Sequence, residues 1–319
     1  MTEIKDNFDR TFKTLRVSLL NTCNLACVYC CFGNEDSKEN YRSGKNQALQ
    51  ADELLKLIAK LHERLDLSVV RLTGGEPLLY KELPELVRGI RNLGINDLKL
   101  TTNGLLLENM APALQAAGIS SINVSLDAID PEVYHLMSRR HDLSRTLRGI
   151  EAAHRLGIEV KINSVVMKGL NDSQILPLLE YAFQKKIKIR FLEIMAMGHL
   201  HDTADQHFFS QEEILSRIDT HYPAFPLPRK SSSTSNYWQT EDGNIFGIVA
   251  NESEPFCSDC NRLRLDAYGN IYGCLSSNSP ISILKTDAQL LDSSLREALA
   301  QKQSIKFTGS TLSMLHIGG

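Results

Sequence analysis

The segment LRVSLLNTCNLACVYCC, residues 15–31, contains the pattern that decides both the fold and the chemistry. It begins as an apolar run, typical of a strand that is buried on both faces. Cys23, Cys27 and Cys30 follow on one short loop with the spacing C-x3-C-x2-C. Three thiolates on one loop suit an iron–sulfur cube, in which one iron then stays open for another molecule. The segment therefore predicts a strand that ends at a metal centre.

Zinc is the alternative metal for this loop, and it ordinarily needs four nearby protein ligands. Cys31 is available as a fourth ligand, but neighbouring residues in an extended loop usually point in opposite directions. The chain has seven cysteines, and none lies between Cys31 and Cys257. An odd number of cysteines in two compact groups argues against a disulfide framework and favours metal binding.

Strand-like and helix-like segments alternate from residue 15 to about residue 221. Apolar residues recur at helical spacing over residues 54–65, 143–154 and 175–183. This alternation predicts an α/β fold with a parallel sheet and right-handed crossovers, and it leaves a doubly wound sheet and a partial barrel open. The predicted strands are Leu15–Leu20, Ser68–Leu72, Leu98–Thr101, Ile122–Leu126, Val160–Val166 and Ile187–Ile194.

The alternation breaks at residues 223–235, which contain three prolines and a Ser/Thr run. We place a domain boundary there, so that residues 1–222 form one domain and residues 223–319 a second. Residues 33–47 are rich in Asn, Ser, Gly and charged residues and are predicted to form a loop. In the C-terminal part we expect short strands and one helix, at residues 244–249, 262–266, 270–274 and 288–301.

A second group of three cysteines lies in the segment FCSDCNRLRLDAYGNIYGC, residues 256–274. Cys257 and Cys260 form C-x2-C, and Cys274 follows after thirteen intervening residues. A zinc ribbon would normally show C-x2-C twice, and no histidine lies nearby in sequence. Two sites with three cysteines each predict two iron–sulfur clusters, each with one iron free for a non-protein ligand.

Positive charges lie within predicted strands, where an apolar residue is the default. Arg16, Arg71 and Lys161 occupy the first, second and fifth strands. A charge there is costly unless it faces a polar lumen or a partner, so in a partly open barrel all three can point into one cavity. Arg262 and Arg264 alternate in a later strand and therefore face one side. A solvated strand face is the alternative interpretation of this pair.

The first cysteine motif, with its aromatic residue before the last cysteine, resembles the signature of the radical S-adenosylmethionine (SAM) superfamily. The segment TGGEP, residues 73–77, resembles that superfamily's GGEP element, in which glycines let the backbone approach a ligand closely. The resemblance implies a partial (β/α)6 barrel of the TIM type with a C-terminal cluster-binding extension. Chemistry is then expected at the carboxyl ends of the strands. The SAM contacts that the resemblance implies are Tyr29, Gly75, Ser125 and Met195.

The segment FCSDCNRLRL, the third cysteine after it and the terminal IGG resemble the molybdenum cofactor biosynthesis protein A family of GTP 3′,8-cyclases. The resemblance runs from Leu15 to the last residue. It implies a radical SAM lyase with two [4Fe–4S] clusters, the second of which binds the guanine of GTP. The GTP contacts that it implies are Arg16, Arg71, Thr101, Lys161, Arg262, Leu263 and Arg264. Arg190 is a weaker candidate without a family counterpart.

The chain departs from this family at two places. After the third cysteine the family often continues with Met-Pro, whereas this chain has Cys31-Phe32. The tail FTGSTLSMLHIGG, residues 307–319, lacks the arginine that commonly precedes the double glycine. In the family this tail is thought to enter the active site, and a frayed end is the alternative for Gly318-Gly319.

Composition and charge exclude several classes of partner. The chain has 319 residues, with 35 Lys and Arg against 38 Asp and Glu, which excludes a globally basic nucleic-acid binder. No apolar run approaches the ~20 residues of a membrane span, and the first ten residues lack the apolar part of a secretory signal. We therefore expect a cytoplasmic protein with no nucleic-acid and no membrane partner.

The family resemblance also implies partners. These are GTP as the substrate, a reductase or flavodoxin-type electron donor, and cyclic pyranopterin monophosphate synthase as the next enzyme; a homodimer is left open. Two other functions compete with this interpretation. A peptide-modifying radical SAM maturase usually has more cysteines in its C-terminal domain and an added peptide-binding module. A zinc-stabilised binding module would explain the cysteines without catalysis, and iron content distinguishes it from the radical SAM enzymes.

Overall fold

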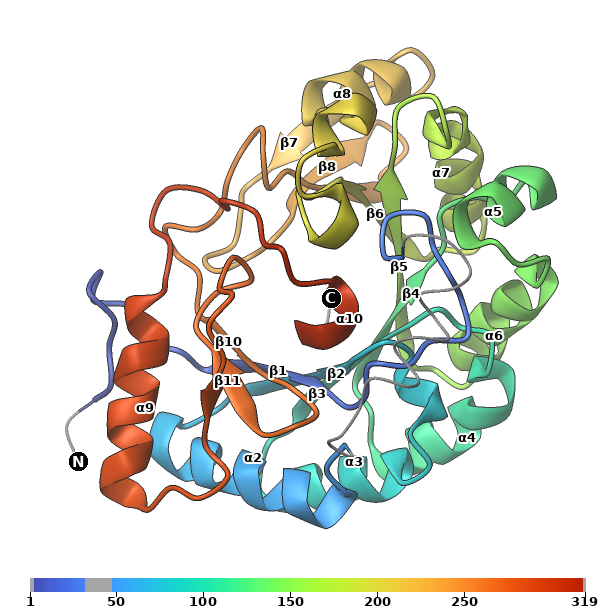
Figure 1. Ribbon diagram of the computed structural model, residues 1–319. Coiled ribbons are helices and arrows are strands. Elements are labelled where there is room, and N and C mark those ends of the chain that lie inside the picture. Colours follow the sequence, from blue (N-terminus) through green and yellow to red (C-terminus); the bar gives the residue numbers. More distant parts are fainter. Residues whose placement is uncertain (1–2, 32–47, 318–319) are drawn as a thin grey trace.

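The computed structural model describes residues 3–31 and 48–317 (Figure 1). The predicted loop at residues 33–47 and the pair Gly318-Gly319 lie outside the described residues. The described part folds around one curved sheet of twelve strands, and its helices lie mainly outside this sheet (Figure 1).

The six strands predicted for the barrel are confirmed, and each is parallel to the next. The first ends at Ser18 rather than at Leu20, because the following peptide groups bind the loop after the second strand. Leu19 N donates to Thr73 O (3.0 Å), and Leu20 O accepts from Gly75 N (2.7 Å). The strands are β1 (Thr14–Ser18), β2 (Val69–Thr73), β3 (Asp97–Thr102), β4 (Ser121–Ser125), β5 (Glu159–Val166) and β6 (Lys188–Glu193).

Helices connect these strands and bury one apolar face each against the sheet. In α2, for example, Leu54, Ile58 and Leu61 are fully buried, as the periodic pattern at residues 54–65 predicts. The patterns at residues 143–154 and 175–183 likewise lie in α6 and α7. The helices are α2 (Ala51–Leu65), α3 (Leu83–Asn92), α4 (Leu107–Ala117), α5 (Pro131–Ser138), α6 (Leu143–Arg155) and α7 (Ile175–Gln184).

The C-terminal part adds strands to both edges of the six-stranded core. β10 pairs parallel with β1, and β9 pairs parallel with β6, while the outermost strands are antiparallel. The order β12-β11-β10-β1-β2-β3-β4-β5-β6-β9-β8-β7 leaves the sheet open, which confirms a partial barrel. The added strands are β7 (Ala224–Leu227), β8 (Asn236–Thr240), β9 (Ile245–Val249), β10 (Arg262–Leu265), β11 (Asn270–Tyr272) and β12 (Ile281–Ser282).

Three of the added strands, β7, β8 and β12, were not predicted from the sequence. β7 lies inside the proline-rich break and contains Pro226, which an edge strand tolerates because its outer side has no ladder partner. The strands expected near residues 244–249, 262–266 and 270–274 are confirmed. The domain boundary between residues 222 and 223 stays a prediction, and the sheet continues across it.

Three more helices belong to the C-terminal third: α8 (Gln211–Asp219), α9 (Ala288–Ala300) and α10 (Met314–Ile317). α9 confirms the predicted helix near residues 288–301. The short helix α10 lies in the middle of the ring that the strands and helices form (Figure 1). No helix within residues 3–31 and 48–317 combines the length and hydrophobicity that a bilayer crossing requires.

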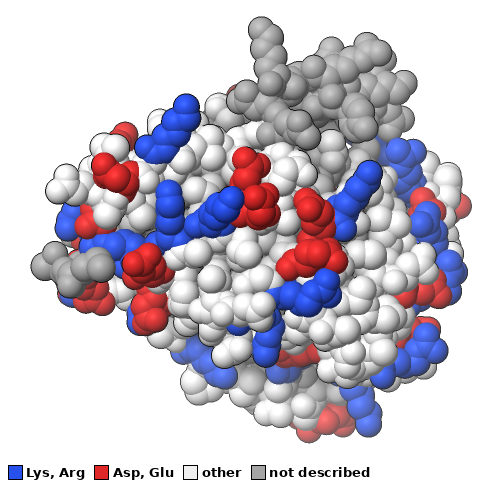
Figure 2. All heavy atoms as spheres, turned by 90° about the horizontal axis from the view of Figure 1, so that it is seen from below, with Lys and Arg blue, Asp and Glu red and all other residues white. Residues whose placement is uncertain are grey.

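The outer helices carry their charges in mixed pairs. On the face shown in Figure 2, Lys and Arg side chains lie interspersed with Asp and Glu. Lys56 and Asp52 of α2 form an ion pair of 3.2 Å, and Arg88 and Glu85 of α3 form one of 2.8 Å. Exposed pairs of this kind contribute little to stability but keep the surface electrically balanced.

We predict that Gly273→Ala destabilises the junction between β11 and α9. A Cβ atom at Gly273 would lie 1.7 Å from the backbone oxygen of Ala298, so one of the two elements must shift. Overpacking of this kind costs about 1–3 kcal/mol. Urea denaturation should show this loss, whereas Ser293→Ala on the exposed side of α9 should change the free energy of unfolding by less than about 0.5 kcal/mol. Equal effects of the two substitutions would contradict the predicted packing.

Candidate functional site

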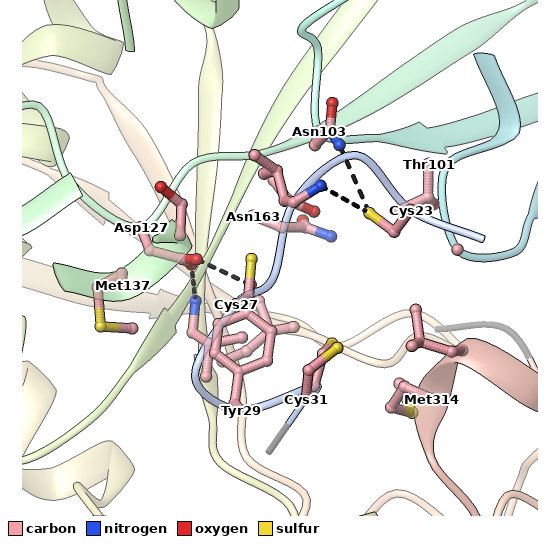
Figure 3. A pocket seen from close by; sticks show the side chains of 18 of the residues that line it. Cys23, Cys27, Tyr29, Cys31, Thr101, Asn103, Asp127, Met137, Asn163 and Met314 are labelled. Atoms are coloured by element: carbon pink, nitrogen blue, oxygen red, sulfur yellow. Dashed lines mark hydrogen bonds between the residues drawn. The ribbon is translucent and has the colours of Figure 1, made fainter. Parts of the chain in front are cut away.

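One cavity of about 190 Å³ opens where the parallel strands end. Its wall contains residues from the last positions of the parallel strands, from the loops that follow most of them, and from the C-terminal segment. Figure 3 shows the labelled side chains around it, with Asp127 and Met137 on one side and Met314 on the other. The carboxyl ends of the strands therefore form one shared site, as the barrel resemblance predicts.

The first three cysteines, Cys23, Cys27 and Cys30, all line this cavity. Their loop is held by α5, since Ala26 N donates to Ser138 O (3.2 Å) and Val28 N donates to Met137 O (2.9 Å). The wall of a single cavity thus carries three thiols on one anchored loop.

Burial strongly affects the ionisation of these thiols. It raises the pKa of Cys23 to about 12 and also raises the pKa values of Cys27 and Cys30. Thiols in such surroundings stay neutral until a positively charged centre joins them. Three half-buried sulfur donors around one cavity fit an iron–sulfur cube. Among the described residues, no group of three or more His, Cys, Asp or Glu side chains converges on a position for one metal ion.

Cys31 lies in the wall of the same cavity and is buried, rather than pointing away from the other cysteines. The physical reason is that residues 27–31 form a tight turn and not an extended loop. The amides of Cys30 and Cys31 both donate to Cys27 O, at 2.9 and 3.1 Å.

The two glycines of the TGGEP segment pack against the cysteine loop. Gly75 N donates to Leu20 O (2.7 Å), and Glu76 N donates to Thr22 O (2.9 Å). A Cβ atom at Gly75 would lie 2.1 Å from the backbone oxygen of Thr22. The resemblance to the GGEP element implies that these glycines let a ligand approach, and the structure adds a second reason, which is the contact between two loops.

Glu76 is a functional candidate that the sequence analysis missed. Its buried carboxylate accepts hydrogen bonds from Leu78 N (2.9 Å), Thr102 Oγ1 (2.6 Å) and Asn103 N (2.8 Å). Burial raises the pKa of Glu76 to about 7, although these three hydrogen bonds favour the charged form. The carboxylate joins the loops after β2 and β3 and so fixes two walls of the cavity.

The four SAM candidates, Tyr29, Gly75, Ser125 and Met195, all line this cavity. Tyr29 Oη donates a hydrogen bond of 2.8 Å to a carboxylate oxygen of Asp127, whose other oxygen accepts from a backbone amide of β5 at 2.8 Å. Burial raises the pKa of Asp127 to about 6. The structure thus brings the four candidates together with the three cysteines; their individual roles stay predictions.

Three arginines occupy one row across neighbouring strands. Arg16 on β1 stands opposite Arg71 on β2 and Arg264 on β10. Paired residues of parallel strands point to the same side of the sheet, so the three guanidinium groups share the inner face. Burial and the neighbouring arginines lower the pKa of Arg16, and burial lowers the pKa values of Arg71 and Arg264 to about 10.

This arrangement is electrostatically unfavourable without an anion. Within the part of the chain that the structure describes, neither Arg16 nor Arg71 forms an ion pair with a carboxylate. Arg71 Nη1 donates to Thr101 Oγ1 (3.3 Å), and Thr101 also lines the cavity of the first cysteines. Desolvated cations without an ion pair, such as Arg16 and Arg71, are costly, so this part of the inner face is prepared for a negatively charged ligand.

The other GTP candidates are placed as follows. Lys161 shares the inner face but pairs with Glu159 at 3.0 Å. Arg262 donates to Ser232 O (2.8 Å) and lies on the same side of β10 as Arg264. The Leu263 side chain is fully buried in the core on the opposite side, so only its backbone remains available to a ligand.

Arg190, the weaker candidate, also reaches the inner face. Its Nε and Nη2 atoms donate to Asn163 Oδ1 at 3.0 and 2.6 Å. Asn163 lines the cavity and stands opposite Arg190 in the register of β5 and β6. Only the pairing of the two strands brings these residues together, so no local signal could have identified the pair.

The second cysteine group surrounds the start of β10. Cys260 N donates to Cys257 O (3.2 Å), which closes a tight turn. Burial raises the pKa of Cys257 to about 11. Burial acts in the same direction on Cys260, but the nearby cations Lys302 and Arg262 prevail and lower its pKa to about 6.

Lys302 was also missed by the sequence analysis, because it comes from the end of α9. Its ammonium group donates to Cys260 Sγ at 3.5 Å. Arg10, from the N-terminal segment, donates to Cys257 O. Segments far apart in sequence therefore surround the second group.

The C-terminal segment contacts both cysteine regions. Ser313 Oγ donates to Cys30 O (3.2 Å), and Arg264 Nη1 donates to Ile317 O (3.1 Å). Met314 and Leu315 of α10 also line the first cavity. The predicted approach of the tail to the active site is thus supported up to Ile317.

Comparison with known proteins identifies the family. Residues 17–182 match the radical SAM superfamily, and residues 187–308 match the family described as Molybdenum Cofactor Synthesis C. The GTP 3′,8-cyclase of Aquifex aeolicus is 39% identical over 275 residues, which cover 86% of this chain and 85% of that protein. The GTP 3′,8-cyclase of Staphylococcus aureus strain JH9 is 38% identical over 277 residues, which cover 86% of this chain and 81% of that protein.

Solved structures support the fold alone, since their sequences are distant. SuiB of Streptococcus suis, bound to its precursor peptide SuiA, superposes with a TM-score of 0.68 at 16% identity, over 92% of this chain and 67% of that chain. Native anSMEcpe with bound AdoMet superposes with a TM-score of 0.61 at 16% sequence identity, over 91% of this chain and 81% of that chain. The matches of both halves and the similarity over most of the sequence agree: the chain belongs to the radical SAM superfamily and, within it, to the GTP 3′,8-cyclase family.

Proposed function

We propose that this protein is a GTP 3′,8-cyclase, which uses SAM to convert GTP into (8S)-3′,8-cyclo-7,8-dihydroguanosine 5′-triphosphate in the first step of molybdenum cofactor biosynthesis. The observation that carries the proposal is the row of Arg16, Arg71 and Arg264 on neighbouring strands. At one end Arg71 contacts Thr101 of the first cavity, and at the other end Arg264 lies on β10, the strand that follows Cys260. The curated relatives at 38–39% identity support the same activity.

Membership of the radical SAM superfamily implies one [4Fe–4S] cluster and SAM. The half-buried thiols of Cys23, Cys27 and Cys30 fit the cluster and would hold it. The cluster would keep one iron open for SAM and would supply the electron for its reductive cleavage. The protein shapes the pocket: Glu76 fixes the loop that presents Gly75, and Asp127 fixes Tyr29.

The inner arginines are proposed to bind the triphosphate of GTP. A triphosphate carries about four negative charges, which the row of buried cations can neutralise without reorganising. The planar guanidinium groups suit bidentate contact with phosphate oxygens. Cleavage of SAM takes up one electron. The remaining conversion moves the ribose 3′ hydrogen to the adenosyl carbon, joins C3′ to C8 of guanine, and takes up a second electron and one proton.

Cys257, Cys260 and Cys274 are proposed to hold a second [4Fe–4S] cluster. The donor set again offers three sulfur atoms, and a cluster so held keeps one iron open for a ligand. Cys260 and Cys274 act electrostatically on Arg264, so the arginine row that is proposed to bind the triphosphate ends beside this site. The open iron is proposed to bind the guanine base, as the family resemblance implies.

The proposals for the electron donor and for the next enzyme rest on the family resemblance. We propose a reductase or flavodoxin-type protein as electron donor and cyclic pyranopterin monophosphate synthase as the enzyme that consumes the product. A homodimer and a cytoplasmic location stay predictions of the same kind.

An anaerobic assay tests the proposed function. Protein reconstituted with iron and sulfide is incubated with SAM, dithionite and GTP, and the products are analysed by mass spectrometry. The expected products are 5′-deoxyadenosine and a cyclised dihydronucleotide in equal amounts. Modification of an added peptide without any cyclised nucleotide would instead support the peptide-modifying maturase.

We predict that Arg16→Met weakens GTP binding without weakening the fold. Loss of a charge-assisted contact costs about 1.5–3 kcal/mol, or roughly a 10- to 150-fold increase in the dissociation constant. Removal of a buried cation that has no ion pair should leave the stability of the GTP-free protein unchanged or higher. Calorimetry with GTP and thermal unfolding check both expectations, with the exposed Arg88→Met as the matched control. A GTP affinity equal to that of Arg88→Met would contradict the assignment.

We predict that replacing Cys257, Cys260 and Cys274 together by Ala abolishes cyclisation but spares SAM cleavage. The variant should lose about half of its iron, because the first site keeps its three thiols. Iron analysis and measurement of 5′-deoxyadenosine formed with dithionite check this separation. Unchanged iron content, or unchanged cyclisation, would rule out the second cluster.

We predict that Glu76→Gln reduces both stability and SAM affinity. The side-chain amide would direct a donor at a backbone N–H or a hydroxyl, which leaves a buried polar group unsatisfied at a cost of about 1–3 kcal/mol. Urea denaturation and SAM binding measure the two effects, and Glu85→Gln on the surface of α3 serves as the control. SAM affinity equal to that of the control would show that Glu76 does not position the loop.

A further inference from the structure

Lys302 is an unusually placed cation beside the second cysteine group. Its side chain is buried, with the residue only 7% exposed. The ammonium group donates to Cys260 Sγ at 3.5 Å and to the backbone oxygen of Arg262, and it lies 4.7 Å from the centre of the Phe12 ring. Its contacts are thus a sulfur, a carbonyl oxygen and an aromatic face.

This environment lacks the usual partner of a buried lysine. Within residues 3–31 and 48–317, Lys302 forms no ion pair with Asp or Glu. A carbonyl and an aromatic ring compensate only partly for the lost hydration of an ammonium group. The missing negative charge must therefore come from the cysteine group itself.

A cubane cluster at this site supplies that charge. Three thiolates outweigh the positive charge of an oxidised cubane core, so the loaded site is negative, and reduction adds one more negative charge. An ammonium group in contact with one of the thiolates stabilises the reduced form more than the oxidised form. Hydrogen bonds to cluster sulfur atoms are among the factors that set reduction potentials.

Among the described residues, no Lys or Arg side chain donates a hydrogen bond to the sulfur atoms of Cys23, Cys27 or Cys30. Among the hydrogen bonds of the described residues, the donors to Cys23 Sγ are Leu25 N (3.4 Å) and the Asn103 amide (3.8 Å), which are neutral. Neutral donors stabilise added negative charge less than an ammonium group does. The two sites therefore differ in electrostatic character, although one row of arginines joins them.

We propose that Lys302 is a positioning residue of the second cysteine site, whose N–H···S contact with Cys260 raises the reduction potential of the cluster held there. The inference rests on the proposed second cluster. Lys302 thereby makes the second cluster easier to reduce than it would be without the cation. The first cluster keeps the low potential that cleavage of SAM requires.

The experiment compares Lys302→Met, Lys302→Arg and the exposed control Lys306→Met in full-length protein. All three are made in a background in which Cys23, Cys27 and Cys30 are replaced by Ala, so that only the second cluster contributes to the spectrum. Iron content is measured first, and the midpoint potential then comes from a redox titration followed by electron paramagnetic resonance. Methionine preserves the length of the side chain and removes the charge, whereas arginine keeps the charge.

We expect Lys302→Met to shift the midpoint potential to a more negative value. At a fixed solution potential, the ratio of reduced to oxidised cluster should fall at least tenfold, which corresponds to about 59 mV for one electron. Lys302→Arg should have a midpoint potential close to that of the triple-Ala background. Lys306→Met should have the same midpoint potential as that background. If Lys302→Met loses its cluster while Lys302→Arg keeps it, the requirement for a cation is likewise supported.

Three results would overturn the inference, and they differ in what else they reject. An unchanged potential in Lys302→Met at full iron content rejects the role of Lys302 alone. Loss of the cluster from both Lys302 variants shows a steric role instead of an electrostatic one. Absence of iron from the triple-Ala background, together with about four iron atoms per wild-type chain, rejects the second cluster and the role of Lys302 with it.

Discussion

The parallel pairing of β10 with β1 and of β1 with β2 is the constraint on which the proposed chemistry depends. This pairing places Arg264, Arg16 and Arg71 in one row on the inner face of the sheet. Each guanidinium is desolvated, and the neighbouring arginines disfavour the charged form of Arg16 further. Such an arrangement persists because the rest of the fold is well packed, and a polyanionic ligand relieves its electrostatic cost.

The same pairing explains why the C-terminal part belongs to the site. β10 contributes Arg264 to the row and follows directly after Cys260, so one strand links the proposed phosphate site to the second cysteine group. α10 then returns to the middle of the ring, where Ser313 contacts the first cysteine loop and Ile317 contacts Arg264 (Figure 1). The barrel and its extension thus share the wall of the first cavity, where Met314 and Leu315 of α10 can restrict the access of water.

Much of this architecture was predictable from local sequence. Buried parallel strands produce apolar runs and their helices produce periodic stripes, so all six core strands and the helices α2, α6, α7 and α9 were found. The cysteine spacings likewise identified both groups. β7 was missed because its prolines indicate a break, and only its edge position makes them acceptable in a strand.

Local sequence could not show which residues from distant segments contact one another. Glu76 meets Thr102 and Asn103, and Lys302 meets Cys260, only after distant segments pack together. The orientation of Leu263 toward the core follows from strand alternation, but the side of the sheet that forms the core is set by the helices. Cys31 lies in the cavity wall because the loop closes into a tight turn. The prediction assumed an extended loop, in which Cys31 would point away from Cys30.

The central claim is that one chamber holds SAM and GTP so that the adenosyl carbon meets the ribose 3′ hydrogen. Incubation with GTP deuterated at the 3′ position, followed by mass spectrometry of the released 5′-deoxyadenosine, tests it most directly. The account predicts 5′-deoxyadenosine that is heavier by about one mass unit, together with a cyclised nucleotide. Unlabelled 5′-deoxyadenosine in the presence of deuterated GTP would show that the hydrogen comes from elsewhere, and it would contradict the account.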